Sequence, residues 1–196
     1  WLVPHFEKML YDNALLLMVY AEAYQLLGRE EHRRVVEGVA AYVLREMTDP
    51  EGGFYSAEDA DSEGIEGKYY LWTPAEVLEV LGERDGREFC EIYDITETGN
   101  FEGKSIPNLI TTPPERVKAR EHDLAVVRQK LLQNRSNRIH PHKDDKILTS
   151  WNGLMIAALA KAFRILGNSA YIRAAEKAMN FILTRLRRAD GRLMAR

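Results

Sequence analysis

An internal repeat limits the folds open to this chain. Residues 13–53 align without a gap with residues 152–192, so that NALLLMVYAEAYQLLG in the first copy matches NGLMIAALAKAFRILG in the second. Glycines coincide at two positions, Gly28 with Gly167 and Gly52 with Gly191. Self-similarity on this scale is typical of proteins that stack identical supersecondary units. The repeat therefore predicts two copies of one helical hairpin.

The two helices of each copy differ in their hydrophobic pattern. Residues 13–27 and 152–166 are apolar on nearly every side, whereas the helix after each of them carries one apolar stripe, which includes Val35, Val39 and Tyr42. An all-round apolar helix is typical of a buried position, and a striped helix is typical of a surface. We therefore expect the first helix of each hairpin to be inner and the second to be outer. Gly28 and Gly167 are expected to end the inner helices in the left-handed conformation.

The segment between the two copies is less regular. GGFYSA and GKYYLW are predicted to be short strands that pair as a hairpin across the acidic loop EDADSEGIE. Thr73, Pro74 and Glu76 predict a helix start with a capping box. A further helix is expected from Thr112 to about Asn134. This reading gives six or seven helices and one hairpin.

Paired inner and outer helices predict a mainly all-α fold, a partial (α/α)6 toroid with a small β-hairpin in a loop. A closed toroid needs about six hairpins, so residues 1–196 are expected to be a fragment of one such domain. Because 27 basic and 30 acidic residues are interspersed, for a net charge of -3, nucleic-acid binding is not expected. No long apolar run or signal segment is evident, which predicts a cytoplasmic protein without a membrane span. A single cysteine, Cys90, predicts an inert thiol and no disulfide.

Four longer motifs carry a resemblance to a known family. They are WLVPHFEKMLYDNALL, GGFYSAEDADSEGIEGKYYLWTPAEV, TGNFEGKSIPNLI and DDKILTSWNGLMIAALAKA. In this order they resemble the barrel portion of the YyaL-like, spermatogenesis-associated thioredoxin-like proteins. The resemblance implies a six-hairpin toroid similar to those of glycosidases and N-acylglucosamine epimerases. The family's thioredoxin-like domain is expected to be absent here, because the sequence has no C-x-x-C.

The loops that enter the two inner helices are rich in polar and aromatic residues. Helix N-termini present unpaired amide groups, and carboxylates, amides and aromatic rings together suit sugars. We expect these loops and the acidic loop to gather at one mouth of the ring. The catalytic carboxylates are expected among Glu7, Asp59, Asp61 and Asp145. Substrate-binding side chains are expected at His5, Tyr11, Asp12, Trp72, Asn100, Lys146, Trp151 and Asn152.

Each of these residues also has a structural interpretation. Asp12 or Asn13 could cap the first inner helix, and Thr149 or Ser150 could cap the second. The acids of the loop could be solvated turn residues. The aromatic residues Tyr11, Trp72 and Trp151 could close the end of the core. No metal site or cofactor is predicted.

Three classes of function remain open, and a small-molecule sugar or polyol is the expected ligand. The first is a glycosidase-like enzyme in which two carboxylates act as acid and base. The second is an epimerase-like isomerase with His5 as the proton-transferring base. The third is a noncatalytic barrel that binds a sugar, a partner or a thioredoxin-like domain. Exposed apolar faces of half a ring would also favour a homo-oligomer of the fragment.

Overall fold

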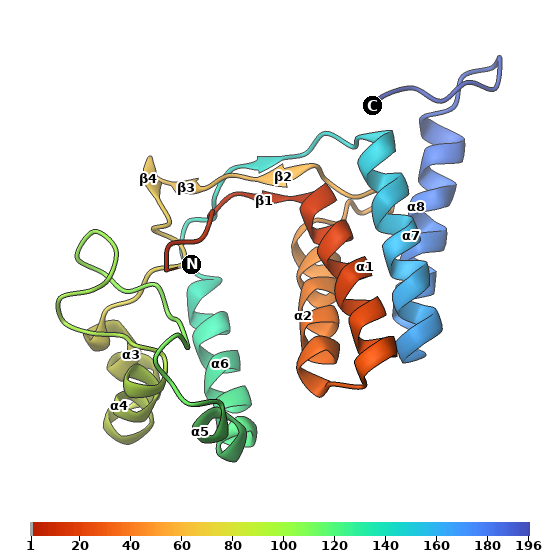
Figure 1. The fold of residues 1–196 in the computed structure, drawn as a ribbon. Helices are drawn as coiled ribbons and strands as arrows, with labels where there is room; N and C mark the ends of the chain where they lie inside the picture. Colours follow the sequence, from red (N-terminus) through yellow and green to blue (C-terminus); the bar gives the residue numbers. More distant parts are fainter. Residues whose placement is uncertain (1) are drawn as a thin grey trace. The chain divides into compact units, whose positions relative to one another are not determined.

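The computed structural model describes residues 2–196, and the chain divides into two compact units. The first unit combines residues 2–6 with Ala60–His142, and the second combines Glu7–Asp59 with Lys143–Arg196. Both units are drawn in Figure 1. The described residues are mainly α-helical with a few short strands, which confirms the predicted fold class. Membership of residues 1–196 in a single toroid domain stays a prediction.

Eight helices and five two-residue strands lie within residues 2–196, one helix more than the upper predicted number. The helices are α1 (Leu10–Leu27), α2 (Glu30–Glu46), α3 (Pro74–Leu81), α4 (Glu83–Ile92), α5 (Pro114–Ala119), α6 (Glu121–Arg135), α7 (Thr149–Leu166) and α8 (Ser169–Arg185). The strands are β1 (Lys8–Met9), β2 (Ala57–Glu58), β3 (Asp61–Ser62), β4 (Ile65–Glu66) and β5 (Lys143–Asp144). Among residues 2–196, none of the helices combines the length and apolar composition that a membrane span requires.

The second unit contains the two repeat copies as neighbouring hairpins. Helix α1 packs against both α2 and α7, and α7 packs against α8, as Figure 1 shows. Gly28 and Gly167 end α1 and α7 in the left-handed region, with φ values of 63° and 74°, and their N–H groups donate to the carbonyls of Tyr24 and Phe163. Glycine adopts this conformation without a Cβ penalty, so the predicted helix ends are confirmed.

The predicted burial of the first hairpin is wrong. Leu16 and Val19 on α1 are 48% and 59% exposed, whereas Val35, Val39 and Tyr42 on α2 are half-buried. Helix α1 buries only the stripe that meets α2 and α7, which consists of Leu10, Ala14, Leu17 and Ala21. An apolar residue is buried only where a neighbouring element covers it, and the other face of α1 is open. Helix α7 behaves as predicted, with Met155, Ala158 and Leu159 fully buried.

The predicted pairing of GGFYSA with GKYYLW is also wrong. In the second unit, β2 is the middle strand of an antiparallel three-stranded sheet in the order β1–β2–β5. In the first unit, β3 pairs with β4 as a hairpin inside the acidic loop. The chain turns at Gly67, whose carbonyl accepts from the N–H groups of Tyr70 and Leu71 at 2.8 and 3.2 Å. Because this turn replaces extended backbone, Tyr69 and Tyr70 do not belong to a strand.

The first unit is built around α3, α4 and α6, which pack on one another over Val77, Phe89 and Leu124. The capping box is confirmed, because Thr73 Oγ1 accepts from the Glu76 N–H at 3.2 Å and Glu76 Oε2 accepts from the Thr73 N–H at 2.7 Å. The predicted helix from Thr112 to about Asn134 is interrupted at Arg120, which separates α5 from α6.

Candidate functional site

The second unit brings together eight of the twelve predicted site residues near one small sheet. Strand β1 runs directly into α1, and β2 pairs with both β1 and β5. The eight residues lie in or beside these strands and in the first turns of α1 and α7. They are Glu7, Tyr11, Asp12, Asp59, Asp145, Lys146, Trp151 and Asn152.

Two predicted carboxylates, Glu7 and Asp59, directly flank the paired residues of β1 and β2. Lys8 pairs with Glu58 and Met9 with Ala57 in the antiparallel ladder of β1 and β2. Continuing this register by one residue pairs Glu7 with Asp59, and both residues are exposed. Neighbouring strands lie roughly 4.8 Å apart. The sheet therefore favours two adjacent carboxylates at this end of β1 and β2.

The third predicted acid of this unit, Asp145, directly follows β5 and is exposed. Its neighbour Lys146 contacts the carboxylate of Asp144, with Nζ 2.9 Å from Oδ2. The hydrogen bond from Lys146 is the largest of the influences that lower the pKa of Asp144. Lys146, predicted to bind substrate, is thus already engaged with a neighbouring acid.

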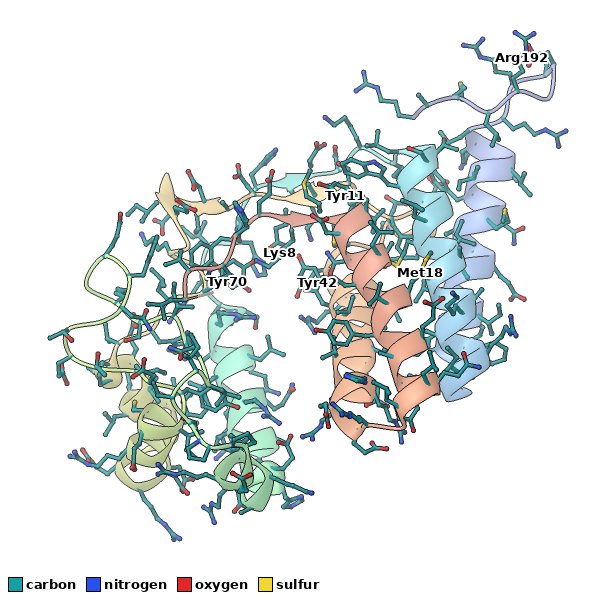
Figure 2. All side chains as sticks on the ribbon, viewed as in Figure 1. Lys8, Tyr11, Met18, Tyr42, Tyr70 and Arg192 are labelled. Atoms are coloured by element: carbon teal, nitrogen blue, oxygen red, sulfur yellow. The ribbon has the colours of Figure 1, made fainter. Side chains whose placement is uncertain are left out.

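An aromatic pair joins the starts of α1 and α7. The rings of Tyr11 and Trp151 meet edge to face, with centroids 4.8 Å apart and an interplanar angle of 61°. Both residues are half-buried. Figure 2 labels Tyr11 at the start of α1. Aromatic rings combined with acids are the composition that sugar sites use.

Asn152 has a structural role in this unit. It is fully buried, and its Oδ1 accepts from the Phe54 N–H at 2.8 Å. Its Nδ2 donates to the carbonyls of Phe54 and Leu148 at 2.9 and 3.0 Å. The amide therefore ties α7 to the segment before β2.

The alternative interpretation of Asp12, Asn13, Thr149 and Ser150 as helix caps is wrong. The N-cap positions are Met9 and Leu148, and neither makes a side-chain capping bond. Asn13 instead donates to the Met9 carbonyl at 2.8 Å, and Thr149 donates to the Met194 carbonyl at 2.6 Å. Each helix begins earlier than expected, so the predicted caps lie inside it.

The other four predicted site residues lie in the first unit. His5 and Asp61 are exposed, and Asp61 pairs with Glu66 across the β3–β4 hairpin. Trp72 is only 4% exposed and belongs to the core. The side-chain amide of Asn100 forms two hydrogen bonds with the backbone of Ile106. It accepts from the Ile106 N–H at 2.7 Å and donates to the Ile106 carbonyl at 3.0 Å. A common mouth for these residues and those of the second unit stays a prediction.

One buried acid, Glu58, is not among the predicted site residues. Glu58 is 2% exposed, and its Oε2 accepts from the Tyr42 hydroxyl at 3.2 Å. It is the cross-strand partner of both Lys8 and Lys143, so the three side chains form one row on the same sheet face. A buried carboxylate requires partners of this kind. No local signal distinguishes Glu58 from Asp59, because its burial depends on α2 and on both neighbouring strands.

Among residues 2–196, no three His, Cys, Asp or Glu side chains gather in a way that could hold a metal ion. The polar groups of the second unit can instead donate and accept hydrogen bonds and exchange protons. Their arrangement suits a hydroxylated ligand that stacks on an aromatic ring.

The sequence has clear relatives among known proteins, although no family model matches it. Spermatogenesis-associated protein 20 of Homo sapiens is 38% identical over 99% of this chain, and that of Mus musculus is 36% identical over 93%. An uncharacterised protein of Caenorhabditis elegans is 30% identical over 93%. The chain spans 29%, 27% and 29% of the lengths of these three relatives, respectively.

Solved structures show only distant similarity. A D-mannose isomerase matches 92% of this chain and 41% of its own, with 13% identity and a TM-score of 0.31. A cellobiose 2-epimerase from Spirochaeta thermophila matches 96% of this chain and 62% of its own, with 15% identity and a TM-score of 0.28. Homology over nearly the whole chain, rather than these structures, places the protein in the family of spermatogenesis-associated protein 20 and confirms the resemblance of its motifs.

Proposed function

We propose that this chain is part of a carbohydrate-binding helical toroid, and that its sugar or polyol site lies beside the β1–β2–β5 sheet of the second unit. The observation that carries the proposal is the half-buried Tyr11–Trp151 pair in the same unit as three exposed acids, Glu7, Asp59 and Asp145. An aromatic face packs on the apolar side of a sugar ring, while carboxylates accept hydrogen bonds from its hydroxyl groups.

A glycosidase-like reaction is the form of activity that the strand register favours. Glu7 and Asp59 are opposite each other when the β1–β2 register is continued by one residue. Retaining glycosidases hold their two carboxyl groups about 5–5.5 Å apart, close to the spacing of neighbouring strands. In this proposal one of the pair protonates the leaving oxygen and the other attacks the sugar carbon.

Sugar binding is tested first, by titrating the chain with a panel of monosaccharides, disaccharides and polyols while recording tryptophan fluorescence and NMR spectra. We expect a saturable change with at least one of them, and its loss in Tyr11→Ala. Glu176→Gln, on the exposed surface of α8, is the matched control and should bind as the wild type does. A panel without any saturable binding would contradict the proposal.

Turnover is tested separately, with nitrophenyl glycosides of the sugars that bind. We expect release of nitrophenol to be lost in Glu7→Gln and in Asp59→Asn, while both variants still bind sugar. Binding without turnover in the wild type would reject the glycosidase-like reaction and leave the noncatalytic alternative, a barrel that binds a sugar.

A further inference from the structure

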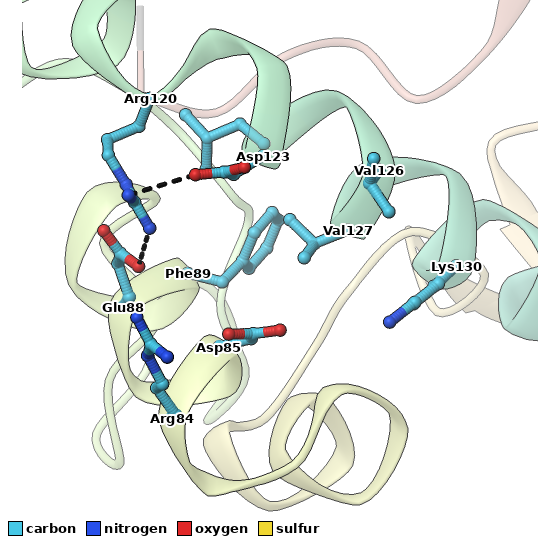
Figure 3. A pocket seen from close by; sticks show the side chains of 10 residues that line it. Arg84, Asp85, Glu88, Phe89, Arg120, Asp123, Val126, Val127 and Lys130 are labelled. Atoms are coloured by element: carbon cyan, nitrogen blue, oxygen red, sulfur yellow. Dashed lines mark hydrogen bonds and ion pairs between the residues drawn. The ribbon is translucent and has the colours of Figure 1, made fainter.

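Two cavities of the first unit differ in their balance of charge. The cavity between α4 and α6, shown in Figure 3, measures about 270 Å³. Its three cationic side chains face three carboxylates, and Arg120 is engaged with both Glu88 and Asp123. This balance favours no particular ligand. The second cavity, of about 340 Å³, has an excess of cations.

The second cavity, here called the Arg138 pocket, is formed by segments far apart in the sequence. The β3–β4 hairpin, the turn after it, the start of α3 and the loop after α6 all contribute to its wall. The lining residues are Ser62, Glu63, Lys68, Tyr69, Glu76, Lys104, Asn137, Arg138 and Ile139. All of them belong to the first unit.

Arg138 is held in place by contacts that leave part of its guanidinium available. Its Nη1 donates to the carbonyls of Tyr69 and Leu71 at 3.1 and 2.7 Å, and the guanidinium lies over the Trp72 ring at 4.1 Å. Its Nη2 is 3.9 Å from Glu76 Oε2, too far for a hydrogen bond. A fixed guanidinium with unused N–H groups is suited to bind a carboxylate.

Two lysines add further donors to the pocket. Lys104 Nζ donates to Glu76 Oε1 at 3.0 Å, and Lys68 Nζ lies 2.6 Å from Glu63 Oε2. Each ammonium has three N–H donors, so these contacts do not exhaust either of them. Both Glu76 oxygens are occupied, because Oε2 accepts from the Thr73 N–H. Three cations against two carboxylates leave one positive charge and an excess of donors.

We propose that the Arg138 pocket binds a small hydroxylated carboxylate, such as a sugar acid. The single excess positive charge matches one carboxylate, and the guanidinium fork of Arg138 matches its two oxygens. The exposed Asn137 amide supplies hydrogen-bonding groups for ligand hydroxyls. This site lies in the first unit and does not depend on the sugar site proposed for the second.

The test is an NMR titration of the whole chain with D-glucuronate, glucose and glucose 6-phosphate. We expect saturable shifts with glucuronate at pocket residues and none there with glucose. Lys104→Met should weaken glucuronate binding by at least about fivefold, because it removes a charged donor. Lys118→Met, on the exposed surface of α5, is the matched control and should leave binding unchanged.

Lys104 also pairs with Glu76, so circular dichroism must show that Lys104→Met is folded. If it is not, Lys68→Met carries the same expectation, because Lys68 lies on a turn with its side chain 40% exposed. The proposal is overturned if glucuronate does not saturate, if glucose produces the same shifts, or if the folded lysine variant binds as the wild type does. Tighter binding of glucose 6-phosphate than of glucuronate would also overturn the choice of a carboxylate.

Discussion

Replacing Asn152 with alanine should destabilise the second unit. The buried amide makes three hydrogen bonds, two of them to the N–H and carbonyl of the fully buried Phe54. Asn152→Ala leaves both Phe54 groups without this partner, and an unsatisfied buried group costs about 1–3 kcal/mol. We expect a loss of ~3 kcal/mol in the free energy of unfolding, which corresponds to a fall in Tm of roughly 6–12 °C.

The assay is urea denaturation followed by far-UV circular dichroism and tryptophan fluorescence. Asn180→Ala, at an exposed position on α8, is the matched control for losing an amide. Asn152→Asp adds a second measurement, because its carboxylate would face the carbonyls of Phe54 and Leu148 in place of the donating Nδ2. The loss of stability of this variant relative to the wild type should be larger at pH 7 than at pH 4, where the carboxyl group can be protonated.

The reasoning would be refuted if Asn152→Ala unfolded within about 0.5 kcal/mol of Asn180→Ala, the range usual for surface substitutions. A stable Asn152→Ala variant that had lost sugar binding would instead support the original prediction that Asn152 contacts substrate. The two readouts therefore separate the structural role from the binding role.

Three further predictions concern other parts of the chain. Gly99→Ala should lower the free energy of unfolding by more than roughly 2 kcal/mol, because φ is +67° and an added Cβ would lie 2.3 Å from the Lys104 carbonyl oxygen. Gly103→Ala, with φ +78° and open space around the added Cβ, should cost only about 1–2 kcal/mol. Equal losses for the two variants in urea denaturation would contradict this prediction. Partial burial raises the pKa of Glu76, but the Thr73 N–H, Lys104 and Arg138 together lower it below its usual value. The charged Glu76 therefore stabilises the fold at a pH above its unfolded-state pKa, and this contribution is lost as the pH falls through its folded-state pKa. The stability difference between wild type and Glu76→Gln should therefore shrink from pH 7 to pH 3, and a constant difference would reject this linkage. The chain should also self-associate through the exposed side of α1, where Leu15, Leu16 and Val19 are 47–59% exposed. Light scattering should show species larger than a monomer, and Leu16→Gln should reduce their amount. A strictly monomeric wild type would count against this prediction.

Several local features could be predicted from the sequence because they depend on neighbouring residues. The αL ends at Gly28 and Gly167 follow from a glycine placed after an apolar helix, and the capping box follows from Thr73 and Glu76 three residues apart. The two hairpins follow from the repeat, since each copy has the same pattern of helices and glycines. Family membership likewise follows from long motifs that need no structure.

The candidate site was predictable only in part. The sequence correctly indicated that polar and aromatic residues lie at the starts of α1 and α7, and the structure brings Tyr11 into contact with Trp151. It could not separate Glu58, which is buried, from Asp59, which is exposed, although the two are adjacent. It also could not show that the amides of Asn100 and Asn152 are used to bind backbone groups.

By itself, the sequence determined the two repeated helical hairpins, their glycine ends and the capped start of α3, because these depend on hydrogen bonds and side-chain preferences within a few residues. Only the tertiary structure decided the strand pairing of the sheet, in which β2 pairs with β1 and β5 from the two separate segments of the second unit. Strands of two residues carry too little pattern to identify their partners. Their pairing, and with it the burial of Glu58 and the exposure of one face of α1, depends on which distant segments the packed helices bring together.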